Sequence, residues 1–223
     1  MAAKPDHPTA PRIELVIFDC DGVLVDSEPL ALRVCLELGA ELGWPLTERE
    51  IVDRFLGRSE RAVRAQVSER LGEAAADRWA EQYQLRLAEI IEEELTEVDG
   101  ISETLDAIDI PYCIASSGRH EKMRRTLGRT GLYPRFAGRI FSAEEVAHGK
   151  PAPDLFLHAA RQMGVAPERC AVVEDSQYGV QAARAAGMRS FGYAGGLTPA
   201  EWLAGPGTVV FDDMRKLPAL LTA

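Results

Sequence analysis

The chain has 223 residues, 46% of them hydrophobic, and a formal net charge of −10 at pH 7. This length suits one large domain, or a core domain with an inserted subdomain. The negative charge argues against a nucleic-acid surface, and no apolar stretch approaches the ~18 residues of a membrane span. We therefore expect a globular protein that binds neither nucleic acid nor membrane.

The first residues and the cysteines both bear on where the protein works. Residues 1–12, MAAKPDHPTAPR, are rich in proline and lack an apolar core, so they predict a disordered tail and not a signal peptide. The cysteines are scattered without metal-type pairing, and Cys20, Cys113 and Cys170 lie in or beside apolar runs. Buried free thiols are expected there, which fits a cytoplasmic protein.

Short apolar runs alternate with helical patterns along most of the chain. Strands are predicted at residues 15–19, 112–116, 139–142, 170–174, 190–193 and 208–211, and helices at 119–128, 154–163 and 178–186. Apolar runs that are separated by helices indicate a parallel sheet covered on both faces, which is a Rossmann-like α/β core. Ligands of such sheets bind beyond the carboxyl ends of the strands.

One long segment, residues 29–95, contains no convincing strand. Thr47 and Glu50 form a capping-box signature, and residues 74–95 carry apolar side chains at helical spacing. We predict a helical cap domain at 29–95, inserted into an α/β core made of residues 13–28 and 96–223. Trp79 and Tyr83 are expected in the core of this cap.

A pair of acids, Asp19 and Asp21, follows the first predicted strand. Two carboxylates that lie close together are stable only with a cation between them or with one proton retained, and a hard divalent cation bound by oxygens meets that need. The alternative is an ordinary Asp-Gly turn at a strand end. This stretch alone favours neither explanation.

Polar residues also follow other predicted strands. Ser116, Ser117 and Gly118 precede a helix, where hydroxyls and backbone N–H groups bind phosphate oxygens or simply cap the helix. A second acid pair, Glu174 and Asp175, opens another helix. Helix capping by Asp175 or Ser176 is the alternative, but it does not explain the acid at Glu174. Lys150 lies in a predicted loop, and an isolated lysine in a loop is usually a solvated charge.

Together these motifs resemble the haloacid dehalogenase-like superfamily, and the resemblance runs from Leu15 to about Leu220. It is carried by Asp-Cys-Asp-Gly-Val-Leu-Val-Asp-Ser-Glu at 19–28, Ala-Ser-Ser at 115–117, Gly-Lys-Pro-Ala-Pro-Asp at 149–154 and Glu-Asp-Ser-Gln-Tyr-Gly-Val at 174–180. The helical insertion after the first motif resembles the subfamily of phosphoglycolate-type and sugar-phosphate phosphatases and β-phosphoglucomutase.

The resemblance implies a set of roles in phosphoryl transfer. Asp19 would be the nucleophile that forms an aspartyl-phosphate, and Asp21 the general acid and then the base. Ser116 and Lys150 would hold phosphate oxygens. Mg²⁺ would be bound by Asp19, the Asp21 carbonyl, Glu174 and Asp175. The dehalogenases of this superfamily lack the second Asp, so position 21 favours phosphoryl transfer.

The remaining substrate contacts are expected at two places. Ser117, Gly118 and Arg119 would bind substrate beside Ser116. On the cap, Arg58 in FLGRSER (55–61) lies in a predicted turn between helices and would bind an anionic or polyol group, with a solvated surface charge as the alternative. Asp26 and Ser27 are expected to form a structural hinge.

These expectations favour a Mg²⁺-dependent phosphatase that acts as a monomer on a small phosphorylated metabolite, a sugar or polyol phosphate. One alternative is a phosphosugar mutase. Against it, the chain has no His between His7 and His120 and no Lys between Lys4 and Lys122, while the mutase resemblance calls for a His and a Lys in the cap region. A second alternative, a non-catalytic binding protein on this fold, would be expected to have lost residues such as Asp19 or Lys150.

Overall fold

A computed structural model describes residues 11–222 of the chain. The tail expected at residues 1–12 therefore lies outside the described residues, apart from Pro11 and Arg12, which are exposed. No helix in the described part is both long and apolar enough to cross a membrane. All four cysteines are free and buried, as the sequence predicts.

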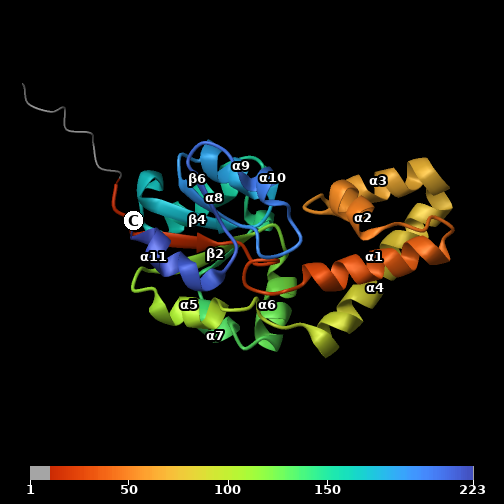
Figure 1. The fold of residues 1–223 in the computed structure, drawn as a ribbon, viewed down its shortest axis with the longest axis horizontal. Coiled ribbons are helices and arrows are strands. Elements are labelled where there is room, and N and C mark those ends of the chain that lie inside the picture. The colour runs from red at the N-terminus through yellow and green to blue at the C-terminus, as the bar shows by residue number, and fades with distance from the viewer. Residues whose placement is uncertain (1–10, 223) are drawn as a thin grey trace, which may run out of the picture.

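A six-stranded parallel sheet forms the core, in the order β3-β2-β1-β4-β5-β6 (Figure 1). Its strands are β1 (Leu15–Phe18), β2 (Tyr112–Ser116), β3 (Ile140–Ser142), β4 (Cys170–Glu174), β5 (Arg189–Tyr193) and β6 (Thr208–Phe211). Each lies within one residue of its predicted bounds. The first strand in sequence lies at the centre of the sheet, paired with β2 on one side and β4 on the other.

Helices cover both faces of the sheet, which is why the strands read as unbroken apolar runs. Side chains alternate along each strand: Val16 and Phe18 join one buried cluster, and Leu15 and Ile17 join the other. The first face packs on α5 (Ile101–Ala107), α6 (His120–Arg129), α7 (Tyr133–Phe136) and α11 (Leu217–Leu221), and the second on α8 (Asp154–Met163) and α9 (Gln177–Ala185). A short helix, α10 (Ala200–Leu203), packs beside β5.

The segment after β1 is helical throughout and projects from one end of the sheet (Figure 1). It comprises α1 (Glu28–Glu41), α2 (Glu48–Phe55), α3 (Glu60–Leu71) and α4 (Glu73–Glu94), which enclose a hydrophobic cluster of their own. The capping box forms as predicted: the Glu50 N–H donates to Thr47 Oγ1 at 3.3 Å, and the Thr47 N–H donates to the Glu50 carboxylate at 2.9 Å. We refer to α1–α4 as the cap, and its exact division from the core stays a prediction.

Candidate active site

The carboxyl ends of β1, β2 and β4 meet at one edge of the sheet, facing the cap. Asp19 follows β1 directly, Ser116 is the last residue of β2, and Glu174 is the last residue of β4. A cavity of about 280 Å³ lies between this edge and the cap. Its polar lining from the core consists of Asp19, Asp21, Ser116, Ser117, Lys122, Lys150, Glu174, Asp175 and Ser176.

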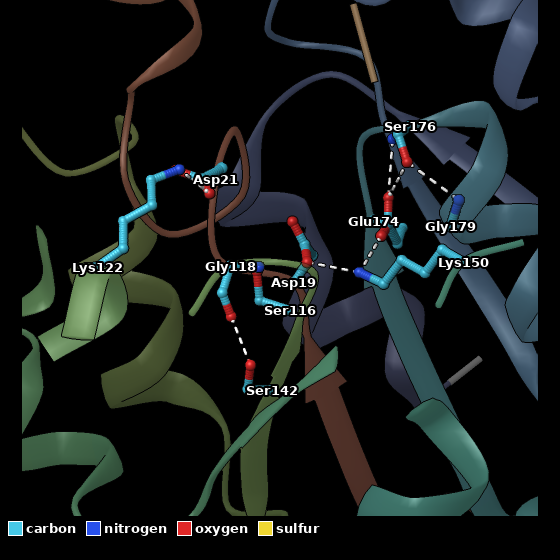
Figure 2. A network of polar contacts seen from close by, with 10 residues as sticks. All are labelled: Asp19, Asp21, Ser116, Gly118, Lys122, Ser142, Lys150, Glu174, Ser176 and Gly179. Atoms are coloured by element: carbon cyan, nitrogen blue, oxygen red, sulfur yellow. Dashed lines mark hydrogen bonds and ion pairs between the residues drawn. The ribbon is translucent and has the colours of Figure 1, made fainter. Parts of the chain in front are cut away.

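Lys150 joins two of the predicted site residues at the floor of this cavity (Figure 2). Its ammonium lies 2.5 Å from Asp19 Oδ1 and 2.6 Å from Glu174 Oε1, and its side chain is only 5% exposed. Burial raises the pKa of Asp19 to about 6, although the charge of Lys150 acts to lower it. Burial also acts to lower the pKa of Lys150, but the two carboxylates outweigh it and hold that pKa above its ordinary value. Lys150 is therefore a buried cation and not the solvated charge that the sequence left open.

Glu174 is held on both of its oxygens, and the motif that follows it explains how. While Oε1 accepts from Lys150, Oε2 accepts from the N–H and the hydroxyl of Ser176, both at 2.8 Å. The helix α9 approaches so closely that a Cβ at Gly179 would lie 1.8 Å from the Glu174 carboxyl carbon. Oε2 accepts two hydrogen bonds and Oε1 only one, so a metal bound directly by Glu174 would share Oε1 with Lys150.

Asp21 is held by two residues to which the sequence analysis gave no chemical role. Lys122 Nζ donates to Asp21 Oδ2 at 2.7 Å (Figure 2). Ser27 Oγ donates to Asp21 Oδ1, also at 2.7 Å. Burial alone would raise the pKa of Asp21, but Lys122 and these hydrogen bonds bring it below its usual value. The hinge role expected for Ser27 stays a prediction, but its hydroxyl also binds Asp21 and does not cap α1. The only sequence signal for Lys122 was its position in the first turn of a helix that follows the end of a predicted strand.

The loop after β2 brings some of its predicted residues to the cavity and not others. Ser116 is buried and its Oγ accepts from the Gly118 N–H at 3.2 Å, while Ser117 lines the cavity. Gly118 lies beside them, where an added Cβ would be 3.8 Å from Asp21 Oδ2. Arg119 is placed elsewhere: its side chain is 82% exposed and lies 3.9 Å from Glu144, because it precedes α6 and turns away from the sheet edge. We correct the expectation that Arg119 binds substrate.

The cap contributes a mostly apolar wall with one arginine. Arg58 lines the cavity from the turn between α2 and α3 and forms no ion pair with another described residue. Ser59 caps α3 by accepting from the Ala62 N–H. Trp79 lies in the cap core as expected, packed edge-on against Phe55. Tyr83, one turn further along α4, packs against the cap core as expected and also lines the cavity.

The acidic residues that remain suit a divalent cation. Asp175 is 4% exposed, and its Oδ2 has no hydrogen-bond partner. Gly22 (φ 74°) leaves room for it, since a Cβ there would lie 2.2 Å from that oxygen. Within residues 11–222 no ready-made cluster of three metal-binding side chains is present. Mg²⁺ does not require one, because it is usually bound by one or two carboxylates together with waters and substrate phosphate. Asp19, Asp175 and the Asp21 carbonyl fit that pattern.

Comparisons with known proteins agree with this geometry. A family model described as haloacid dehalogenase-like hydrolase matches residues 13–187. The 6-phosphogluconate phosphatase of Escherichia coli K12 is 34% identical over 213 residues, covering 95% of this chain and 96% of that enzyme. A haloacid dehalogenase-like protein of unknown function from Agrobacterium tumefaciens is 38% identical with a TM-score of 0.86, covering 94% of this chain and 97% of the other. A HAD family hydrolase from Deinococcus radiodurans, solved with bound phosphate and sodium, is 31% identical with a TM-score of 0.80 and 96% coverage of each chain.

Motifs, fold and relatives agree over most of the length of the protein. The six parallel strands and the cap after β1 are those expected from the motifs, and the matched region contains every residue proposed for the site. The chain therefore belongs to the haloacid dehalogenase-like hydrolase family.

Proposed function

We propose that the chain is a Mg²⁺-dependent phosphatase that hydrolyses a small sugar or polyol phosphate through an aspartyl-phosphate at Asp19. The observation that carries the proposal is the cavity in which Asp19, Asp21, Ser116 and Lys150 meet beneath the cap. The name of the E. coli relative, 6-phosphogluconate phosphatase, supports both the reaction and the substrate class.

In the first step a carboxylate oxygen of Asp19 attacks phosphorus, and the bond from phosphorus to the substrate oxygen breaks. Asp21 gives its proton to that leaving oxygen. In the second step Asp21 removes a proton from water, the water oxygen attacks phosphorus, and phosphate leaves Asp19. Ser116 and Lys150 bind the non-bridging phosphate oxygens throughout. Since Lys122 favours the ionised form of Asp21, Asp21 must leave Lys122 and take up a proton from solvent before it can act as an acid.

Bound Mg²⁺ would offset the charge of the carboxylates and of the phosphate, with Asp19, Asp175 and the Asp21 carbonyl as its protein donors. The cap would close over the sugar and keep bulk water out. Arg58 and Lys122 line the same cavity and are the proposed contacts for polar or anionic groups of the leaving sugar.

The cap favours hydrolysis over mutase chemistry. A mutase must return the phosphoryl group to a second hydroxyl before water reaches it. Among the described cap residues that line the cavity, Arg58 is the only cation. Glu60, the first residue of α3, lines a neighbouring cavity with Arg58 and would repel a distal phosphate. We therefore expect water to take the phosphoryl group.

The proposed function is tested by phosphate release from a panel of 6-phosphogluconate, fructose 1-phosphate, a hexitol phosphate, phosphoglycolate and β-glucose 1-phosphate. Release should occur with Mg²⁺ and stop in excess chelator. β-Glucose 1-phosphate, given with a trace of its bisphosphate, should yield free phosphate if it reacts. Full turnover in chelator would exclude the metal-dependent mechanism, and glucose 6-phosphate formed without phosphate release would show a mutase.

The pH dependence of metal binding follows from the raised carboxyl pKa values. Burial raises the pKa of Asp19 to about 6 and that of Asp175 well above its ordinary value. When these groups are protonated, Mg²⁺ must displace protons to bind. Because the folded pKa values are raised, the metal-free protein gains stability from these groups as the pH falls through that range. We expect the Mg²⁺-induced rise in melting temperature to be large near pH 8 and to shrink near about pH 5.5, as thermal melts with and without Mg²⁺ would measure.

A further inference from the structure

Glu28 is a cavity acid to which the motifs and the proposed mechanism give no role. It is the first residue of α1, where the chain passes from the core into the cap. Its side chain lines the cavity, and its Oε2 is buried without a hydrogen-bond partner. A free carboxylate oxygen in a buried place is costly unless something binds it.

A second acid of the cavity, Asp175, also has a buried oxygen, Oδ2, without a hydrogen-bond partner. Both carboxylates lie against Gly22, where an added Cβ would be 2.2 Å from Asp175 Oδ2 and 3.2 Å from the Glu28 carboxyl carbon. The free oxygens of a core acid and a cap acid therefore share one small space.

The lysines of the cavity do not neutralise this pair. Lys150 is bound to Asp19 and Glu174, and Lys122 is bound to Asp21. No ion pair reaches Glu28 or Asp175 from any residue in the described part of the chain. The space between these acids therefore has local negative charge and no protein cation.

Helix capping does not account for Glu28. An acid in the first turn of a helix is stabilised by the helix dipole, but that effect is available to an exposed side chain. It gives no reason to bury the carboxylate against a second one. A proton shared between the two carboxylates can hold them together in the metal-free protein. A cation that displaces this proton would satisfy both free oxygens at once.

We propose that Glu28 belongs to the divalent-cation site and supplies its donor from the cap side, opposite Asp175. The inference rests on the proposed Mg²⁺-dependent function and adds to it a metal contact from α1. Cation binding would then fix the first turn of α1 to the carboxyl end of β4. Metal occupancy would control how firmly the cap is attached at its entry point.

The test uses titration calorimetry to measure Mg²⁺ binding to the metal-free protein. It compares wild type, Glu28→Gln and Glu37→Gln. Glu37 is the matched control because it lies on the same helix but faces Arg86, 3.8 Å away. Glu28→Gln should raise the Kd for Mg²⁺ by about tenfold or more, the size of effect seen when an outer partner of a metal site is removed. Glu37→Gln should leave it unchanged.

A thermal melt of the same proteins gives a second readout that does not depend on activity. Without metal, Glu28→Gln should melt at or above the wild-type temperature because a repelling charge is gone, and it should gain less from added Mg²⁺. A wild-type Kd in Glu28→Gln, or a lower melting temperature of that variant without metal, would overturn the inference. Failure of the proposed function would instead appear as wild-type protein that binds Mg²⁺ but releases no phosphate.

Discussion

Asp19→Asn is expected to lower the turnover of every phosphate ester by about 10⁴-fold or more. Removing a covalent nucleophile lowers turnover by this order of magnitude. A neutral amide cannot form the phosphoryl bond on which both steps depend. The fold should survive, since the amide oxygen can still accept from Lys150, which lies 2.5 Å from Asp19 Oδ1. Steady-state phosphate release and a thermal melt measure the two effects.

Two further measurements make this prediction specific. Asp26→Asn is the matched control: Asp26 lies in the same motif but does not line the cavity, so its variant should keep near-normal turnover. Mass spectrometry of rapidly quenched wild type should find a phosphoryl group on Asp19, and none should appear in Asp19→Asn. If Asp19→Asn retained most of the wild-type activity, water would attack the substrate directly and the aspartyl-phosphate would be excluded.

Lys150→Met is expected to give the largest loss of stability of any change in the site, about 3–5 kcal/mol in metal-free protein, as when one partner of a buried ion pair is removed. Methionine keeps most of the length of the side chain but leaves Asp19 and Glu174 buried without their cation. Urea unfolding in chelator at about pH 7.5 would measure the change in the free energy of unfolding. Phosphate release should fall as well, since Lys150 is the proposed ligand of a phosphate oxygen.

The cause of that loss can be separated from a general effect of removing lysine. Lys216→Met removes an exposed cation bound to Asp212 and should leave the free energy of unfolding nearly unchanged. The loss of unfolding free energy caused by Lys150→Met should be smaller in a Glu174→Gln background, because only one buried carboxylate, that of Asp19, then lacks a cation. A loss no larger than that of Lys216→Met would mean that the buried ion pair contributes little to stability.

The fold was predictable from sequence because each of its elements carries a local signal. The six apolar runs became the six strands, and the helix expected at 154–163 has those bounds in the structure. The predicted strand ends also gave the correct positions of Asp19, Ser116 and Glu174. The carboxyl ends of parallel strands lie at one edge of the sheet, however long the segments that connect the strands are. The helices α5 and α7 were not predicted, because they are short and their apolar residues offer little periodicity.

The side chains that were misjudged depend on contacts that no local pattern encodes. Tyr83 and Trp79 are one turn apart on α4, yet of the two only Tyr83 lines the cavity, and their helical spacing does not distinguish them. Lys122 meets Asp21 across 101 positions of sequence. Arg119 was expected at the cavity from its neighbours in sequence, but its backbone turns the side chain toward Glu144.

The central position of β1 has a consequence for the order in which the protein forms during synthesis. Residues 28–94, which make up α1–α4, are contiguous and share a hydrophobic cluster, so the contacts within it are available once they leave the ribosome. The strand β1 emerges before them, but its two neighbours in the sheet begin only at residues 112 and 170. A nascent chain therefore carries the complete cap segment beside an unpaired apolar strand until most of the polypeptide has been made. Chaperones that bind extended apolar segments would be able to bind β1 in this interval. Asp19 comes together with Lys150 and Glu174 only when the sheet has formed around β1.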